Sequence, residues 1–544
     1  MSRFACSSPP AALLALLLSG AAMAPAVRAF AHEDKRLGFK IDAPSGWNEL
    51  PLAPDEKWIV GRFKCSKLDI YVDREWGGEH YAEMTIIAFP AEETSRKGPK
   101  VTKDGDSIKI DLSSPYKNYK EYFNKTYTGG GHFVDAEKEA KVGPVAATQL
   151  SIKVEKLTSN GPRRVTTWVY HLPDLDIAVQ FETLENAFEK RENEILSALK
   201  SFKTIAKAAA NPAEKAPADA AVSYEDLKKL TPEERKVRRQ AMADATAKQL
   251  SAKLPNGWSA QPMGRFFVLS HVDQSYAQKV VEQGDAILAW LDKNLEYFGK
   301  GEFVRRPVLR IFKDQEEFRS YRGGLWWGGS NLEIVTYKDN DGWLTWSTDQ
   351  FNTSVLNHWL RERDYDLALA FPSWLRTGLD GVFEKVKLKG GQLDFPSDPW
   401  ERVGLAENVR AGKALKPREI MTTPGAQIGW ANNRQHEATA LVRYFIAGAG
   451  SRDTKMKTIF KNYLSALKAT VLEISKESAG KEDAAPKKPK TEEEEEAAFK
   501  ARASGWKEKE KRVLDSTVKR AFGSWKDADW DYLDNAYFST IKNN

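Results

Sequence analysis

The chain has 544 residues, 41% of them hydrophobic, which is enough for about three domains of ~150 residues each. Its 82 Lys and Arg residues nearly balance its 76 Asp and Glu residues, so the net charge is only +6. This balance argues against a nucleic-acid-binding protein, because such proteins concentrate basic charge in a patch or stripe.

Residues 1–31 have the pattern of a secretory signal peptide. Arg3 is basic, residues 11–22 are apolar over the length of an h-region, and Ala29-Phe30-Ala31 is a cleavage motif, with cleavage after Ala29 or Ala31. We therefore expect an exported protein, periplasmic or extracellular, with no transmembrane segment. Removal of the signal leaves Cys65 as the single cysteine, which excludes an intramolecular disulfide.

Residues 32–204 predict an α+β domain with an antiparallel sheet. Several stretches rich in β-branched and aromatic residues are expected to be strands, and two stretches with helical spacing are expected to be helices. The strands are "KLDIYVDREW", "YAEMTIIAFP", "VAATQLSIKVEK", "RRVTTWVYHL" and "LDIAVQFET", and the helices are "YKNYKEYFNK" and "ENAFEKRENEILSALKSF".

This first block resembles the PsbP-like α/β/α sandwich family. The resemblance rests on "FKIDAPSGW" at its start, on the strand pair "VAATQLSIKV" and "RRVTTWVYHL", and on the closing "ILSALKSF". The resemblance covers about 165 residues, from about Leu37 to Phe202. It carries no catalytic signature, and it implies binding or assembly rather than catalysis.

Residues 205–223 are rich in Ala and Pro and predict a linker. A charged connecting helix is expected within residues 224–262, because Thr231 and Pro232 form a typical helix start. Residues 263–475 then predict a small mixed sheet followed by a helical half. Residues 476–512 are charged and of low complexity, and residues 513–544 regain apolar spacing and are expected to pack on the second domain.

The second block resembles the peptidase-MA-like gluzincin domains, which are zinc metallopeptidases and their relatives. The resemblance rests on "RFFVLSHVDQSYAQKVVEQGDAILAWL", "PVLRIFKDQEEFRSY", "FPSWLRTGLDGVFE" and "QHEATALVRYFIAGAG". In that family two histidines one helical turn apart and a later glutamate hold zinc, and a glutamate after the first histidine is the general base.

Against this pattern the zinc site is degenerate. His358 stands at the first histidine, Glu362 at the second, and Thr377 at the third ligand, while Trp359 occupies the position of the base. An indole donates hydrogen bonds but cannot accept a proton from water. The resemblance thus implies no catalytic residue and no cofactor.

Two alternatives remain open for this stretch. A noncanonical zinc peptidase site would retain His358 and Glu362 as ligands, and a third residue from elsewhere would complete it. Alternatively, the segments are ordinary core helices. His436 is a further histidine that the fold resemblance would place near the cleft, although a histidine on a helix is more often structural.

We expect the partner of such a degenerate domain to be a peptide or protein. Peptidases of this type pair their substrate with an exposed strand edge, and main-chain pairing needs no metal. "GGSNLEIVTYKD" is the edge strand that we predict, with Gly329, Asn331, Glu333 and Val335 as its candidate peptide-binding residues. The oligomeric state is not predicted.

Overall fold

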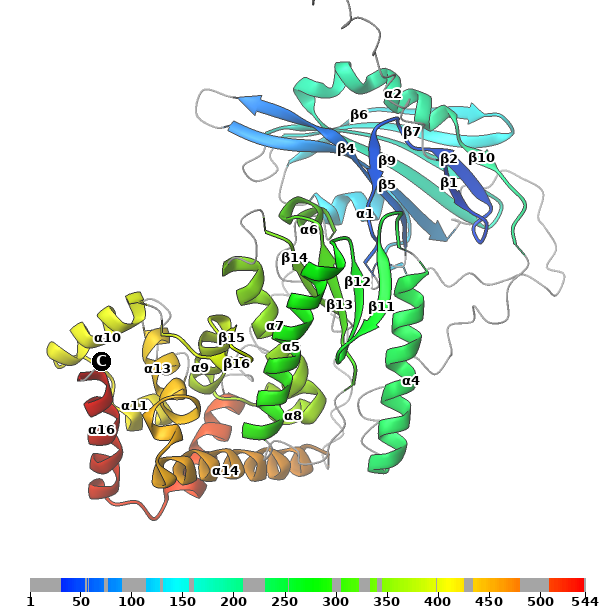
Figure 1. The fold of residues 1–544 in the computed structure, drawn as a ribbon. Coiled ribbons are helices and arrows are strands. Elements are labelled where there is room, and N and C mark those ends of the chain that lie inside the picture. Colours follow the sequence, from blue (N-terminus) through cyan, green and yellow to red (C-terminus); the bar gives the residue numbers. More distant parts are fainter. Residues whose placement is uncertain are drawn as a thin grey trace, which may run out of the picture. The chain divides into compact units, whose positions relative to one another are not determined.

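The computed structural model describes residues 31–53, 56, 58–72, 77–90, 114–127, 131–155, 161–208, 230–252, 254–295, 305–321, 333–339, 345–397, 399–424, 434–479 and 508–542. The chain divides into two compact units (Figure 1). One comprises Met1–Leu52 and Glu56–Glu214, and the other Ala53–Asp55 and Lys215–Asn544. The predicted signal segment up to residue 30 and most of the predicted linker and charged stretch lie outside the described residues.

The first unit is built on a seven-stranded antiparallel sheet with the order β3-β4-β5-β9-β8-β7-β6. The strands are β3 (Trp47–Glu49), β4 (Ile59–Val72), β5 (Gly77–Pro90), β6 (His132–Val142), β7 (Val145–Val154), β8 (Arg163–His171) and β9 (Leu175–Leu184). β6 was not predicted, because it is charged and exposed along most of its length.

One helix covers each face of this sheet. Phe123 of α1 (Tyr119–Thr126) packs with Ile152 and Val165, whereas Leu199 of α2 (Phe188–Lys200) packs with Phe181 on the opposite face. The central strands β8 and β9 are buried almost throughout because both of their faces are covered. The result is the expected α/β/α arrangement.

A small second sheet, β1-β2-β10, pairs the first two strands of the unit with its last strand. Its strands are β1 (Ala31–Asp34), β2 (Phe39–Asp42) and β10 (Lys203–Thr204). Backbone hydrogen bonds from Ile205 and Ala208 back to residues 38 and 35 extend this packing into the start of the predicted linker.

The second unit begins with α4 (Pro232–Ser251) and a four-stranded mixed sheet. Thr231 caps α4 in a capping box with Glu234, as the sequence indicates. The sheet order is β11-β12-β13-β14, and β11 is antiparallel while the other pairs are parallel. The strands are β11 (Ser259–Met263), β12 (Phe266–Ser270), β13 (Val308–Phe312) and β14 (Glu333–Tyr337).

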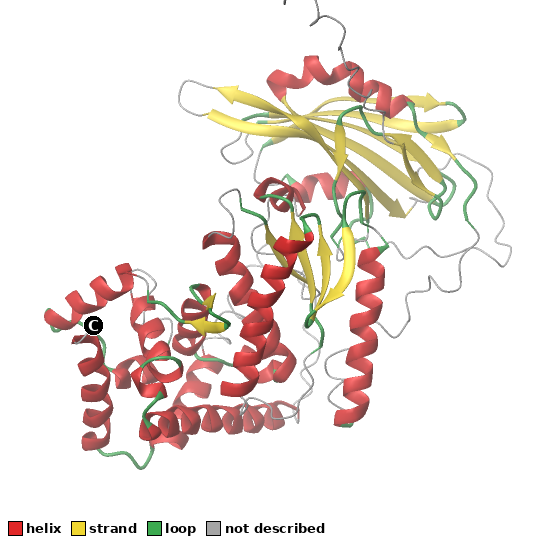
Figure 2. Cartoon of the chain, in the orientation of Figure 1, coloured by secondary structure: helices red, strands yellow, loops and turns green. Residues whose placement is uncertain are grey.

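The remainder of this unit is mostly helical, as Figure 2 shows. The helices and one hairpin are α5 (Gln274–Asn294), α6 (Gln315–Tyr321), α7 (Thr345–Arg363), α8 (Tyr365–Leu369), α9 (Ser373–Glu384), β15 (Lys387–Lys389), β16 (Gln392–Asp394), α10 (Pro399–Arg410), α11 (Pro417–Thr422), α13 (Arg434–Ile446), α14 (Thr454–Ala479), a helix over 508–522 and α16 (Asp527–Lys542). One continuous apolar core joins Val268 of the sheet to Trp359, Trp374 and Leu533. The fold class is therefore α+β in both halves.

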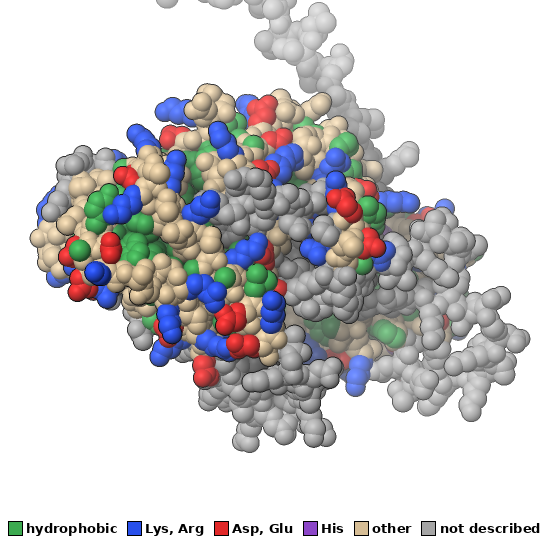
Figure 3. Space-filling model, turned by 90° about the horizontal axis from the view of Figure 1, so that it is seen from below, with side chains coloured by type: hydrophobic (Ala, Val, Ile, Leu, Met, Phe, Trp, Pro, Cys, Tyr) green, Lys and Arg blue, Asp and Glu red, His purple; other side chains and the backbone are tan. Residues whose placement is uncertain are grey.

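Among the described residues, no helix combines the length and apolarity needed to cross a membrane. On the face drawn in Figure 3, the Lys and Arg side chains of the described residues are interspersed with Asp and Glu side chains.

Candidate functional site

Helix α7 presents three faces, and the residues of the predicted metal site divide between two of them. His358 and Glu362 lie one turn apart on one face, where both contact Arg305. Trp359 lies on another face, toward Asp292 of α5. The predicted ligands His358 and Glu362 therefore have different surroundings from Trp359, which stands at the predicted position of the base.

The main chain of Arg305 bridges His358 and Glu362. The Nε2–H group of His358 donates to the Arg305 carbonyl oxygen at 2.9 Å, and the Arg305 N–H group donates to Glu362 Oε2 at 2.9 Å. Because the acceptor is a carbonyl, Nε2 must carry the proton. A metal ion at Nε2 would have to displace this bond, since ligation uses the same nitrogen's lone pair.

Two guanidinium groups complete the surroundings of Glu362. Arg239 of α4 donates from Nη2 to Glu362 Oε2 at 2.5 Å and to the Glu362 carbonyl oxygen at 2.7 Å. The Arg305 guanidinium lies 3.5 Å from Oε1. The carboxylate is only 12% exposed, so its oxygens are committed to protein donors. We call this set (Arg239, Arg305, His358 and Glu362) the arginine clamp.

Electrostatics fix the charge states in the arginine clamp. Burial lowers the pKa of His358 below its ordinary value, although Glu362 opposes the shift, so the imidazole is neutral at neutral pH. Burial alone would raise the pKa of Glu362, but the charged Arg305 and Arg239 guanidinium groups hold it below its ordinary value. The clamp thus contains one carboxylate, two cations and a neutral imidazole.

Trp359 is a core residue and supplies no base. Its side chain is fully buried, and its Nε1–H group donates to Asp292 Oδ1 at 2.8 Å. The Arg363 guanidinium lies 5.2 Å from the indole ring centre and pairs with the same carboxylate. The Trp359 side chain, at the predicted base position, is therefore used for packing and for holding α5 to α7.

Helix α9 carries Thr377, but its adjoining residues serve helix packing. A Cβ atom on Gly378 would lie 2.3 Å from Val442 Cγ2, and one on Gly381 would lie 2.3 Å from Thr439 Oγ1. Small residues thus let α9 approach α13 closely. Thr377 is partly buried. Within the described part of the chain, no three His, Cys, Asp or Glu side chains lie close enough together to share a metal ion.

His436 lies in the first turn of α13 and is partly buried. Its neighbour Glu437 is the deeply buried member of the pair, and it accepts from the Leu415 N–H group at 3.3 Å and from Asn408 Nδ2 at 3.4 Å. The structure records no contact between His436 and His358 among the residues it describes, so a shared cavity stays a prediction.

Of the predicted peptide-binding edge, Gly329 and Asn331 lie outside the described residues. Glu333 and Val335 belong to β14, which pairs with β13 on one side. Both are 7% exposed, and Glu333 accepts from Arg310 Nε at 2.9 Å and from Tyr321. The side chains of Glu333 and Val335 therefore face the interior of the unit, which leaves main-chain groups as their only means of pairing with a peptide.

The third face of α7 lines a small recess that the sequence did not indicate. Asn357 and Arg361 face Arg376 and Asp380 of α9 there, and Asn357 Nδ2 donates to Asp380 Oδ1 at 3.4 Å. Burial raises the pKa of Asp380 to about 6. The enclosed volume of about 20 Å³ holds roughly one water molecule, which is too little for a substrate.

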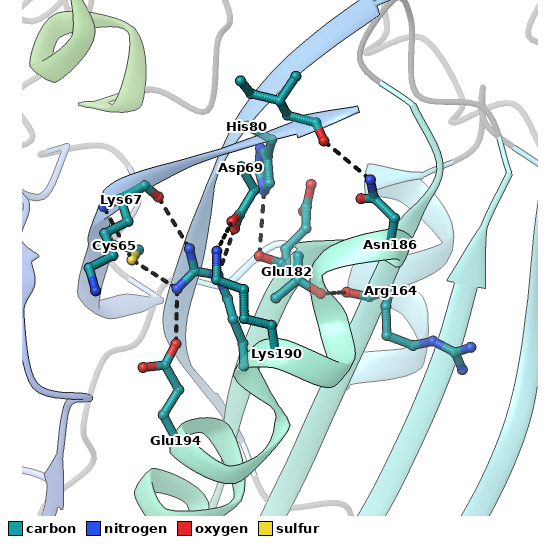
Figure 4. A network of polar contacts seen from close by, with 12 residues as sticks. Cys65, Lys67, Asp69, His80, Arg164, Glu182, Asn186, Lys190 and Glu194 are labelled. Atoms are coloured by element: carbon teal, nitrogen blue, oxygen red, sulfur yellow. Dashed lines mark hydrogen bonds and ion pairs between the residues drawn. The ribbon is translucent and has the colours of Figure 1, made fainter. Parts of the chain in front are cut away.

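The first unit contains a buried polar network around Arg191 of α2, and Figure 4 labels its partners Cys65, Asp69 and Glu194. Arg191 donates to Asp69 at 2.6 Å, to Cys65 Sγ at 3.1 Å and to Glu194 at 3.0 Å. Cys65 is a free, buried thiol. Because these contacts tie α2 to β4, we interpret the network as structural.

Comparison with protein-family models finds no match, and comparison with curated proteins finds none either. Among solved structures, the cyanobacterial PsbP protein of Synechocystis is 13% identical, with a TM-score of 0.23, and the match covers 33% of this chain and 93% of that one. LpqN of Mycobacterium tuberculosis, described as involved in cell envelope biogenesis, is 12% identical, with a TM-score of 0.20, and the match covers 33% and 91%.

Both matches cover the N-terminal part of the chain, where the resemblance to PsbP was predicted. A protein of unknown function from Pseudomonas aeruginosa is 10% identical over 27% of this chain and 99% of its own, with a TM-score of 0.15. At these scores the likenesses carry no functional argument. Nothing in them bears on the resemblance of the second half to gluzincin peptidases, which stays a prediction.

Proposed function

We propose that this chain is an exported, non-catalytic protein that binds a peptide or protein in an extracytoplasmic assembly. In this proposal the second unit is a peptidase-like scaffold whose zinc chemistry has been replaced by structural contacts. The arginine clamp is the observation that carries the proposal, because the main chain of Arg305 already bonds both His358 and Glu362.

Chemistry at the neighbouring positions supports the same proposal. Peptide hydrolysis by zinc needs a ligand set with an open position and an acceptor for a proton from water. The clamp supplies a protonated Nε2 and an ion-paired carboxylate instead. Trp359, at the base position, is hydrogen-bonded to Asp292 in the core.

Partner binding would use main-chain pairing along β14, for which Glu333 and Val335 contribute backbone groups only. Size-exclusion chromatography of the full chain with an extracytoplasmic extract tests this role. We expect the chain to elute earlier with a stoichiometric companion, and an unchanged elution position would count against a stable assembly.

Absence of catalysis is tested with casein, an unstructured protein substrate, incubated with the full chain with and without added zinc. The His358→Ala and Glu362→Ala variants are run in parallel. We expect no hydrolysis above background in any sample. Zinc-dependent hydrolysis by the unaltered chain that disappears in His358→Ala would overturn the proposal in favour of a zinc peptidase with substituted ligands.

A further inference from the structure

A surface groove runs between the first turns of α14 and the start of α16. Its volume is about 470 Å³, within the range of about 300–1,000 Å³ that small-molecule sites occupy. It is lined by Thr454, Lys455, Thr458, Ile459, Asn462, Trp525 and Asp529.

The aromatic side of the groove is held in place by other aromatic rings. The Trp525 ring lies 4.7 Å from the Phe522 ring and 4.7 Å from the Trp530 ring, measured between centroids, and it remains partly exposed. Nearby, Tyr532 is 42% exposed, with the Lys455 ammonium 3.6 Å from its ring centre. A fixed indole offers a flat apolar surface that loses little entropy when a ligand stacks on it.

Most of the other residues that line the groove are polar. Thr454 and Asn462 are exposed on α14, and an amide offers both donors and an acceptor. One oxygen of Asp529 accepts from the Lys526 N–H group at 3.0 Å, which leaves its other oxygen for a ligand. Lys455 and Asp529 carry opposite charges, so their contributions to the net charge of the lining cancel.

We propose that this groove binds a neutral saccharide. A sugar ring has an apolar face of C–H groups, which suits stacking on Trp525, and a rim of hydroxyls that both donate and accept, which suits Asn462 and Asp529. Charge balance disfavours a strongly anionic or cationic ligand. A protein partner would be expected to insert apolar anchors, and among the lining residues Trp525 is the apolar side chain that is partly exposed, because Ile459 is only 5% exposed. This inference is independent of the proposed function.

The test is calorimetric titration of the full chain with neutral tetrasaccharides of glucose, N-acetylglucosamine, xylose and mannose. We expect at least one to bind at low-millimolar concentration or below. Trp525→Ala should weaken that binding about tenfold, as loss of one aromatic stacking contact implies. Asn462→Ala should weaken it as well, and its fold is safe because Asn462 is exposed.

Lys461→Ala is the matched control, since Lys461 is exposed on α14 and does not line the groove. It should bind as the unaltered chain does. The proposal is overturned if no member of the panel binds at low-millimolar concentration. Binding that persists unchanged in both Trp525→Ala and Asn462→Ala would also overturn it, because the sugar would then sit elsewhere.

Discussion

The arginine clamp predicts a large and specific loss of stability when Glu362 is replaced by Ala. That change removes the carboxylate paired with Arg239 and Arg305, whose side chains are only 10% and 17% exposed. Breaking a buried ion pair from one side costs about 3–5 kcal/mol. Because these groups keep some contact with solvent, we expect about 2–4 kcal/mol.

A double-mutant cycle separates the clamp from general disruption. Arg239→Ala removes two hydrogen bonds, each about 1 kcal/mol or somewhat more. The double variant should then lose less than the sum of the single variants, by about 1–2 kcal/mol. Hydrogen exchange read by mass spectrometry over α4 and α7 gives the free energy of opening of these helices directly.

Glu407→Ala is the matched control, because Glu407 is an exposed helical glutamate on α10. Its effect should stay within about 0.5 kcal/mol. The reasoning is refuted if Glu362→Ala behaves like this control, or if the effects at Arg239 and Glu362 simply add. Either result would mean that the clamp contributes nothing as a unit.

Two further predictions concern the surroundings of α9. Gly378→Ala should destabilise the chain by about 1–3 kcal/mol, because the new Cβ atom meets Val442. Gly404→Ala has open space around it and should instead stabilise the chain by about 0.5–1 kcal/mol. Urea unfolding distinguishes the two variants, and equal effects would contradict the close packing of α9. Asp380→Asn should stabilise the chain above pH 6. The folded-state pKa of Asp380 is raised from 3.8 to about 6, so the unaltered chain loses stability as pH rises through about 6. The gain in stability of Asp380→Asn over the unaltered chain should approach about 3 kcal/mol at most and vanish toward about pH 4. A gain independent of pH would contradict the prediction.

Local patterns in the sequence were sufficient to predict the general make-up of the second unit, a small mixed sheet followed by a helical half. Thr231 caps α4, as its place before Pro232 indicated, because its side-chain oxygen and the Glu234 side chain satisfy the first N–H groups. The strand β6 escaped prediction because neither of its faces is buried along most of its length, so no apolar alternation marks it.

The contacts that define the candidate site could not be predicted in the same way. Arg239 and Glu362 are 123 residues apart, and Arg305 lies 57 residues before Glu362. No local spacing signals that these groups meet. The sequence did indicate that Trp359 cannot serve as a base, since that conclusion needs only the chemistry of an indole.

The zinc content of the full chain tests the central claim most directly. The protein is dialysed against zinc, freed of excess metal and measured by elemental mass spectrometry, together with His358→Ala. If the arginine clamp has replaced the metal site, both proteins should hold far less than one zinc per chain. One zinc per unaltered chain, lost in His358→Ala, would contradict the account, because His358 would then be a ligand.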